Sequence, residues 1–293
     1  MLNKNSTYLL DFKKNKTSQF GEDGIIEKIL EILPKEEDPW CVEFGAWDGL
    51  FCSNTNSLIT DKGFQAVLIE GDRKKIPDLK KTYEKFLDRV HILHKWVDFD
   101  RNSIDTLLKQ TDIPSNFTLI SLDIDGEDYH IWHSIIEYKP KIVVIEFNLT
   151  IPMNIDVVQK RGSGNALGAS ALALQKLGKD KGYELVSMTD NNMIFVDEHY
   201  FPLFEIKDNS CSTLFAPFEQ TYITQIYQRY DGGWVLHGNK HMFWYGVYLD
   251  LRDEDVQIVP KFIRFFFASK PRYMRAVAKA YMLIFRRKNL RKH

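Results

Sequence analysis

The stretch WCVEFGAWDG, residues 40–49, joins a largely apolar run to a turn that contains two glycines. A segment rich in Ser and Asn follows and leads into residues with helical apolar spacing. This order predicts a strand, a tight turn and a helix, the unit from which parallel α/β sheets are built. Ligands of such sheets bind at the carboxyl ends of the strands, where glycine lets the backbone come close.

The residues of this turn limit the class of ligand that it can bind. It lacks the third glycine of the dinucleotide pattern G-x-G-x-x-G, and Trp47 and Asp48 stand where a pyrophosphate would need room and positive potential. An acidic residue in this position disfavours a phosphate and suits a cationic sulfonium with an amino-acid tail. The competing interpretation is an ordinary glycine turn without a ligand.

Further apolar runs recur along the chain, at residues 65–71, 89–97, 117–125, 141–148, 183–189 and 192–198. Helical stretches are predicted from a start near Ser18 and then at 53–62, 74–87, 101–110, 127–137 and 168–181. This alternation predicts an α/β fold with a Rossmann-like, doubly wound, seven-stranded sheet that is mostly parallel. Only a Thr-Asp-Asn turn separates the last two runs, which predicts an antiparallel hairpin at one sheet edge.

Composition favours a globular intracellular protein. Hydrophobic residues make up 44% of the 293, which is ample for a packed core. The three cysteines show no C-x-x-C spacing, so a disulfide framework is disfavoured and a reducing compartment is expected. The sequence shows no signal peptide and no apolar run of the ~20 residues that a membrane span needs. We therefore expect a cytoplasmic location.

Charge is distributed unevenly along the chain. Residues 261–293 contain eleven Lys and Arg and no Asp or Glu, whereas the first 260 residues carry 28 basic against 40 acidic. Basic and bulky apolar residues alternate in this tail, so it is predicted either to contact the inner face of a membrane peripherally or to dock as a helix. Nucleic acid is the less favoured partner, because no RNA-binding module accompanies the charge.

Three segments are predicted on this basis. Residues 1–200 form the α/β domain that carries the site, and residues 261–293 form a basic amphipathic tail. Residues 201–260 are aromatic-rich and irregular, and they are predicted to form an extension that is either a cap over the site or a packing appendage. The composition does not separate these two interpretations.

Two acidic residues after later strands suggest nucleoside contacts. Glu70 ends the run QAVLIE, where an acidic side chain accepts hydrogen bonds from ribose hydroxyls in nucleotide-binding folds. Asp98 follows the third run and is predicted to accept from an adenine amino group beside the apolar face of Phe99. The alternatives are local: capping of the next helix by Asp72 in the first case, and by Asp100 or Ser103 in the second.

The sequence DIDGED, residues 123–128, places four acids within six residues after the fourth run. Asp123 and Asp125 are expected on one side of the strand if it runs that far. Glu146 and Asn148 end the next run, so Asp125, Glu146 and Asn148 are predicted as ligands of Mg²⁺ or Ca²⁺. Alternatively, one carboxylate serves as general base for an acceptor hydroxyl, or the acids merely cap a helix near residue 127.

The ordered series of motifs resembles the FkbM-type branch of class I S-adenosylmethionine-dependent methyltransferases. The resemblance covers roughly residues 15–198, and the stretches that carry it are SQFGEDGI, EFGAWDG, LIEGD, SLDIDGEDYHIW, KPKIVVIEFN, GASALALQKLGKDKGYELV and NMIFV. Trp47 departs from the small or polar residue of many relatives, and residues 201–260 match no known extension.

This resemblance implies an O-methyltransferase that acts on a hydroxyl of a sugar, a polysaccharide precursor or another natural product. The acceptor is then a small molecule or a glycan. S-adenosylmethionine is the implied cofactor, bound at Glu43, Gly45, Asp48, Gly49, Glu70 and Asp98. The acceptor side is implied around Asp123, Asp125 and Glu146, with the two aspartates as catalytic candidates. The alternatives are a non-catalytic interaction module on the same scaffold and a nicotinamide-dependent oxidoreductase.

Overall fold

The computed structural model describes residues 5–99, 101–124, 126–164, 167–228, 234–242, 247–248, 272–273, 276–277, 279–281 and 283. Its main sheet consists of β1 (Trp40–Phe44), β2 (Gln65–Glu70), β3 (Val90–His94), β4 (Leu119–Leu122), β5 (Ile142–Glu146), β6 (Tyr183–Met188) and β7 (Asn192–Asp197). The helices around it are η1 (Tyr8–Phe12), α1 (Glu22–Ile32), α2 (Asn56–Lys62), α3 (Ile76–Thr82), α4 (Ile104–Leu108), α5 (Asp128–Ser134), α6 (Ala171–Asp180), η2 (Phe201–Phe204) and α7 (Cys211–Phe215).

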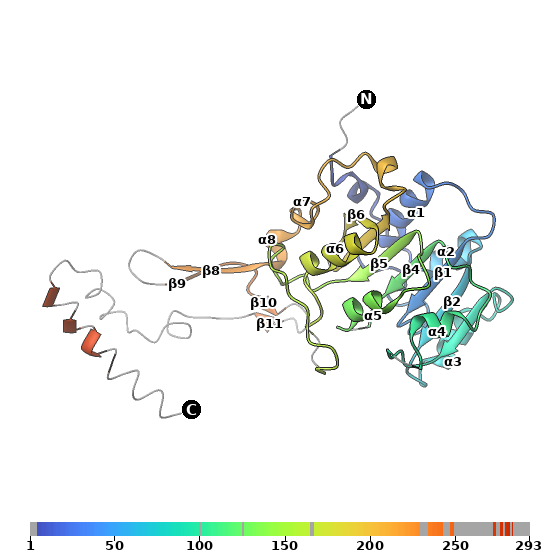
Figure 1. The fold of residues 1–293 in the computed structure, drawn as a ribbon, viewed down its shortest axis with the longest axis horizontal. Helices are drawn as coiled ribbons and strands as arrows, with labels where there is room; N and C mark the ends of the chain where they lie inside the picture. Colours follow the sequence, from blue (N-terminus) through green and yellow to red (C-terminus); the bar gives the residue numbers. More distant parts are fainter. Residues whose placement is uncertain are drawn as a thin grey trace. The chain divides into compact units, whose positions relative to one another are not determined.

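The seven strands form one sheet in the order β3-β2-β1-β4-β5-β7-β6 (Figure 1). Strands β1 to β5 pair in parallel, and β7 pairs antiparallel with both β5 and β6. The chain therefore moves outward from β1 to β3 and returns to β4 on the other side of β1, which creates a reversal point between β1 and β4. This arrangement confirms the predicted doubly wound sheet and the antiparallel hairpin at its edge.

Helices pack on both faces of the sheet because most residues of β1, β2, β4, β5, β6 and β7 are apolar and buried, whereas the edge strand β3 is buried only at Val90. Apolar residues of α1, α2 and α3 join one core cluster with alternate residues of the strands, such as Ile194 and Val196 of β7. Phe195 between them points to the opposite face, where its ring lies 5.0 Å from that of Trp132 in α5. A Cβ on Gly178 of α6 would lie 2.8 Å from the Phe195 ring, so α6 covers this second face too.

The first long helix begins later than expected. The helix predicted near Ser18 begins at Glu22, because Gly21 adopts φ +96° and precedes it. Ser18 still accepts a hydrogen bond from the Asp23 amide at 3.1 Å. Glu22 is fully buried and accepts from the Thr189 hydroxyl and the Asn192 amide, so it ties α1 to the β6–β7 turn.

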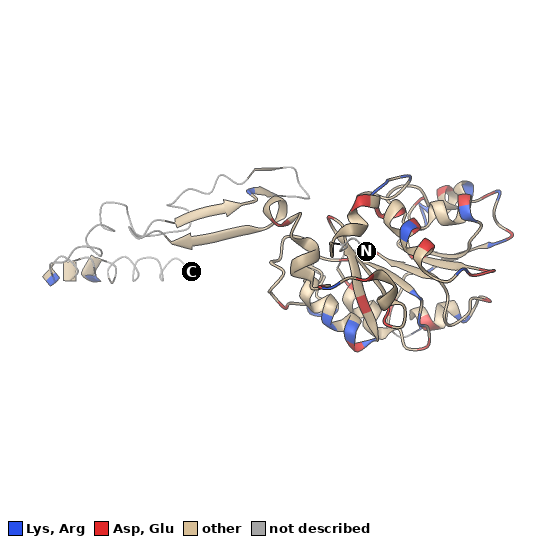
Figure 2. Cartoon of the chain, turned by 90° about the horizontal axis from the view of Figure 1, so that it is seen from above, with Lys and Arg blue, Asp and Glu red and all other residues tan. Residues whose placement is uncertain are grey.

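The described chain divides into two compact units, residues 1–218 and residues 219–293. The first unit includes η2 and α7, whose Phe204 and Leu214 are buried. The predicted division at residues 200 and 260 remains a prediction. The second unit contains α8 (Glu219–Tyr222) and an antiparallel pair of strands, β8 (Thr224–Gln228) and β9 (Trp234–Gly238). Neither of these two strands contains Lys, Arg, Asp or Glu (Figure 2).

The rest of the second unit is described only in part. The two-residue strands β10 (His241–Met242) and β11 (Val247–Tyr248) pair antiparallel. Most of the predicted basic tail, residues 261–293, lies outside the described residues. Among the helices that the structure does describe, none has the length and apolar character required to span a bilayer.

Candidate functional site

The turn after β1 approaches the turn after β4 at the carboxyl edge of the sheet. Gly45 has φ +66°, and a Cβ there would overlap the backbone carbonyl oxygen of Asp123. Gly49 has φ +76° and donates its amide to the Ala46 carbonyl at 2.8 Å, which closes the turn. Both glycines are therefore required by backbone geometry. They lie beside the point at which the strand order reverses, where ligands of such sheets bind.

Glu43 is turned into the protein and holds the start of α2. Its side chain is 4% exposed and accepts hydrogen bonds from the Ser53 hydroxyl at 2.6 Å, the Asn54 amide at 2.8 Å and the Thr55 hydroxyl at 2.8 Å. Burial raises the pKa of the Glu43 carboxyl above its ordinary value, and the negative charge of Asp123 adds to this effect. The structure thus assigns Glu43 to shaping the loop.

Residues 53–57 are a polar run that sequence reasoning treated only as a turn into the helix. All five are buried, and the Ser53 hydroxyl accepts from the amides of Thr55 and Asn56. Glu43 and Ser53 thereby accept from three successive amides, those of Asn54 and Thr55 before α2 and that of Asn56, its first residue. Five consecutive polar residues ahead of an apolar helix were the sequence signal for this network.

Glu70 joins two loops at the carboxyl end of β2. It is 5% exposed, and its two carboxylate oxygens accept from the Trp47 amide at 2.8 Å and the Asp72 amide at 2.6 Å. Trp47 sits at φ +48°, a strained conformation for a bulky residue, and this hydrogen bond holds it there. A carboxylate has about four lone-pair sites, so two remain for a ligand hydroxyl. This geometry suits the predicted ribose contact.

The structure contradicts the interpretation of Asp72 as the cap of the next helix. Its side chain accepts from the Lys74 amide, whereas α3 begins after Lys75.

Asp48 accepts from the amides of Leu50 and Phe51 at 2.9 and 2.8 Å. Burial alone would raise the pKa of Asp48, but these hydrogen bonds and the charge of Lys75 lower it overall. Asp48 is therefore an anion at the mouth of the turn.

The loop after β3 carries an aromatic residue that sequence reasoning missed. The Trp96 ring lies over Gly71, where any Cβ would overlap it, and the side chain is 73% exposed. Asp98 accepts from the backbone and side-chain amides of Asn102 at 2.8 and 3.1 Å, which is a local turn. Ser103 caps α4 as one interpretation predicted, while Asp100 lies outside the described residues.

The acidic segment after β4 is arranged differently from the prediction. β4 ends at Leu122, so strand alternation does not extend to Asp123, and Asp125 lies outside the described residues. Asp128 accepts from the amides of Ile124 and Gly126 at 2.9 and 3.0 Å, which folds the segment into a turn ahead of α5. Asp123 is exposed and stands close enough to influence the titration of Glu43.

Two of the three predicted metal ligands, Glu146 and Asn148, hydrogen-bond to other residues of the protein, and the third, Asp125, lies outside the described residues. Glu146 accepts from the Asn191 side chain at 3.3 Å, and the Asn148 oxygen accepts from the amide and hydroxyl of Thr150. The Asn148 nitrogen donates to the Leu167 carbonyl, so its side chain closes a loop. Within the described ranges, which omit Asp125, no three His, Cys, Asp or Glu residues are grouped to hold a metal ion.

Gln159, in the segment between β5 and α6, forms a polar wall with Glu127 and His130 at the start of α5. Gln159 is 4% exposed, donates to Glu127 at 3.0 Å and accepts from the amides of Leu167 and Gly168. The His130 ring hydrogen-bonds the Gln159 carbonyl at 2.8 Å. The guanidinium of Arg161, from the same segment, lies 3.5 Å from the Phe99 ring centroid and links it to the loop after β3.

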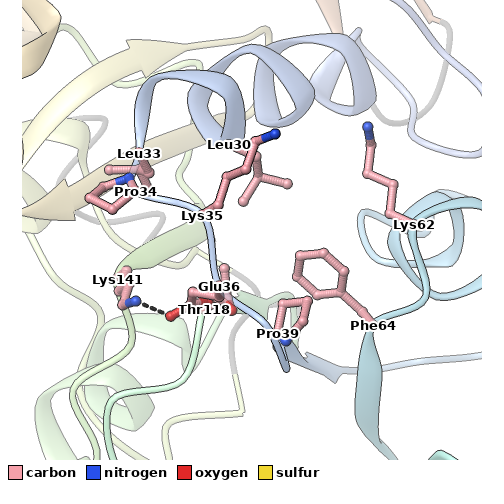
Figure 3. Close-up of a pocket in the computed structure, with 10 residues that line it drawn as sticks. All are labelled: Leu30, Leu33, Pro34, Lys35, Glu36, Pro39, Lys62, Phe64, Thr118 and Lys141. Carbon is pink, nitrogen blue, oxygen red and sulfur yellow. Dashed lines mark hydrogen bonds and ion pairs between the residues drawn. The ribbon is translucent and has the colours of Figure 1, made fainter.

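A separate pocket of about 310 Å³ lies at the amino ends of the strands, on the edge opposite these loops (Figure 3). Its lining residues immediately precede β1, β2, β4 and β5 or belong to α1, α2 and the α1–β1 connection: Leu30, Leu33, Pro34, Lys35, Glu36, Pro39, Lys62, Phe64, Thr118 and Lys141. Glu36 pairs with Lys141 across it. Doubly wound sheets bind ligands at the other edge, so this pocket is not part of the candidate site.

No protein-family profile and no curated protein match the chain. Among solved structures it is similar to the SAH-bound N-terminal domain of EvdMO1, at 12% identity over 60% of this chain and 80% of that one, with a TM-score of 0.41. It is also similar to TrmK of M. capricolum in complex with S-adenosylhomocysteine (10%, 58% and 65%, 0.37) and to the mitomycin 7-O-methyltransferase MmcR (12%, 59% and 54%, 0.34).

The chain thus spans between about half and four fifths of the length of these structures. Likenesses this distant transfer no activity to it. The fold is defined by the strand order itself, in which β7 enters between β5 and β6 on an otherwise parallel sheet. This is the Rossmann-like fold of class I methyltransferases that the sequence analysis predicted.

Proposed function

We propose that the chain is an S-adenosylmethionine-dependent methyltransferase. One observation carries the proposal: the backbone amides that lead into α2, where a dinucleotide-binding sheet would hold a pyrophosphate, already donate hydrogen bonds to protein side chains. Glu43 and Ser53 occupy the amides of Asn54, Thr55 and Asn56. A phosphate would meet the buried carboxyl of Glu43 instead of open N–H donors, which argues against a nicotinamide cofactor.

The charge of the surrounding loops points the same way. Glu70, Asp48, Asp98 and Asp123 all follow or end strands at the carboxyl edge. Carboxylates in these positions favour a ligand with a positive sulfonium and amino group and with ribose hydroxyls that donate hydrogen bonds. The glycine turn supplies the close backbone approach that such a ligand requires. The residues present therefore fit S-adenosylmethionine.

When bound, S-adenosylmethionine supplies a methyl group activated for transfer to a nucleophile. The role proposed for this chain is mainly to orient the two reactants. Glu70 fixes the ribose side while holding the Trp47 turn in place, and Asp98 lies on the adenine side. Holding reactants in line accounts for a large part of such barriers. Asp123, and Asp125 beside it in the sequence, are the proposed acceptors of the hydroxyl proton.

The acceptor side is proposed along the wall formed by Gln159, Glu127 and His130. These side chains offer amide, carboxylate and imidazole groups to a hydroxyl-bearing molecule. One oxygen of the Glu127 carboxylate is buried without a hydrogen bond to the described residues, so it is an acceptor still to be satisfied. A sugar, polysaccharide precursor or other natural product, as the sequence resemblance implies, fits this chemistry.

Isothermal titration with S-adenosylmethionine, S-adenosylhomocysteine and NAD tests the proposal. We expect the wild-type protein to bind both adenosyl compounds and not NAD, and Glu70→Ala to weaken binding about tenfold or more through loss of a charged hydrogen-bonding group. Glu84→Ala, an exposed acid after α3, is the matched control and should bind like the wild type. Circular dichroism of each variant separates lost contacts from lost folding.

Failure of the wild type to bind either adenosyl compound would contradict the proposal and favour a non-catalytic interaction module. Binding of NAD alone would favour the oxidoreductase. Repeating the titration with Mg²⁺ and with a chelator tests the metal requirement, which remains a prediction from the sequence.

A further inference from the structure

The rim of the candidate site exposes an unusual group of large apolar side chains. Trp47, Leu50, Phe51 and Trp96 are 44, 50, 71 and 73% exposed. They lie on the loops after β1 and β3, the two strands that flank β2, so they leave the same edge of the sheet. Contiguous exposed apolar groups of this size mark a surface that meets a partner.

Cations stand between these apolar side chains. The turn after β2 supplies Arg73, Lys74 and Lys75, of which the first two are exposed. The Lys75 ammonium lies 3.8 Å from the centroid of the Trp47 ring, and the Trp96 ring covers Gly71 of the same turn. The two indoles therefore flank the basic turn. We call Trp47, Leu50, Phe51, Trp96, Arg73, Lys74 and Lys75 the mouth surface.

This local charge is opposite to that of the unit as a whole. The turn after β2, residues 71–75, carries three Lys and Arg against one Asp, whereas residues 1–218 carry 25 Lys and Arg against 34 Asp and Glu. An anionic surface would repel the carboxylates of this unit, Asp48 of the loop after β1 among them, and attract Arg73, Lys74 and Lys75, so it would select one orientation of the molecule. An anionic surface is therefore complementary to the cations of the turn after β2.

The mixture of residues favours a lipid surface over a protein. Lysine is depleted in protein–protein interfaces, whereas exposed Trp and Phe interleaved with Lys and Arg are typical of proteins that lie on anionic bilayers. Indole rings settle at the headgroup level, and each nearby cation adds attraction to anionic lipids. We propose that the mouth surface is a peripheral docking site for an anionic membrane.

This docking site has a consequence for the substrate. The candidate site would open toward the headgroups, so its acceptor would be presented from the membrane by a lipid-anchored, hydroxyl-bearing molecule. That consequence rests on the proposed methyltransferase function, whereas the docking itself does not. The mouth surface lies in the first unit and is distinct from the basic tail of residues 261–293.

Cosedimentation of the full chain with phosphatidylglycerol-containing vesicles and with pure phosphatidylcholine vesicles tests the docking. We expect the anionic vesicles to bind the wild type preferentially, in a way that added salt weakens. The triple variant Phe51→Ser, Arg73→Glu, Lys74→Glu should lower the partition coefficient about tenfold or more, since two attractive charges become repulsive. These residues lie outside the proposed cofactor contacts, so titration with S-adenosylhomocysteine should be unchanged.

The matched control is Ile136→Ser, Lys14→Glu, Lys35→Glu, which likewise replaces one large apolar and two basic residues, at exposed positions away from the loops after β1, β2 and β3. It should partition like the wild type. Hydrogen exchange of the wild type supplies a test that needs no variant: vesicles should slow exchange in peptides covering 46–52 and 71–76.

The proposal is overturned if the wild type does not cosediment with anionic vesicles. The partner of the mouth surface would then be another macromolecule. It is equally overturned if the triple variant binds vesicles as the wild type does. The same holds if vesicles slow hydrogen exchange only in peptides other than 46–52 and 71–76, since another segment would then contact the membrane. Vesicle binding without adenosyl-compound binding would preserve the docking site and reject the methyltransferase proposal.

Discussion

Gly45 and Gly63 show how one backbone conformation has different consequences in different surroundings. Both adopt positive φ, +66° and +76°. A Cβ on Gly63 would meet nothing within 4 Å, whereas one on Gly45 would overlap the Asp123 carbonyl. Left-handed backbone alone costs a non-glycine residue about 1–2 kcal/mol. Overlap with backbone adds to that cost, because neither loop can move without breaking hydrogen bonds.

We therefore expect Gly63→Ala to lower the free energy of unfolding by about 1 kcal/mol. Gly45→Ala should lower it by about 1–3 kcal/mol more, the usual cost of overpacking. Urea denaturation followed by circular dichroism measures both. Under the proposed function, only Gly45→Ala should also weaken binding of S-adenosylhomocysteine. Equal destabilisation by the two substitutions would show that the contact with Asp123 is unimportant.

At the scale of elements, Asp23 holds the segment before α1 against α2. One of its carboxylate oxygens accepts from the amides of Lys16, Thr17 and Ser18 at 2.8, 2.9 and 2.8 Å. The other accepts from the Ser57 hydroxyl at 2.7 Å. Burial acts to raise the pKa of Asp23, but these four hydrogen bonds outweigh it and the pKa is lowered overall.

A lowered pKa means that the folded protein prefers the charged form of Asp23. Its contribution to stability is full above the unfolded pKa of about 3.9 and is lost as pH falls through the lower folded value. Asp23→Asn should thus lower the free energy of unfolding by about 1–3 kcal/mol at neutral pH. The difference from wild type should narrow below about pH 4. Asp88→Asn, at an exposed position, is the control.

Denaturant unfolding across this pH range measures the effect. A destabilisation by Asp23→Asn that stays constant from neutral to acid pH would show that the hydrogen bonds do not depend on the carboxylate charge. A variant as stable as the wild type at neutral pH would contradict the proposed tie between the two helices.

At the scale of the molecule, the sheet and its covering helices are complete within residues 1–218. Residues 201–218 contribute to this unit, since Phe204, Leu214 and Phe215 are at most 1% exposed. Burial of each such side chain stabilises a fold by about 1.5–3 kcal/mol. A chain that ends at residue 218 should therefore unfold in one cooperative transition, whereas one that ends at 200 should be markedly less stable.

Thermal and urea denaturation of the two truncated chains test this expectation. Under the proposed function, the 1–218 chain should also bind S-adenosylhomocysteine. Equal stability of the 1–200 and 1–218 chains would mean that η2 and α7 add nothing to the core and would favour the boundary at residue 200 predicted from sequence.

The sequence by itself determined the kinds of element and their order. Apolar runs of strand length, helical spacing between them and a three-residue turn before the last run are local patterns, and they specified the α/β alternation and the β6–β7 hairpin. The glycine turn after β1 and the acidic ends of β1 and β2 were also visible locally. The start of α1 was predicted too early, because the spacing of apolar residues does not reveal that Gly21 adopts a positive φ and so precedes the helix.

Only the tertiary structure decided what the polar side chains of the site contact. Glu43 turns inward to Ser53 and Asn54, and Glu70 bridges Trp47 and Asp72, because the loops after β1 and β2 are brought together by strand pairing. Except for the bond between Glu70 and Asp72, these hydrogen bonds join residues 10 to 23 positions apart. Periodicity reports which face a side chain takes, whereas its partner depends on which loops the folded sheet places side by side.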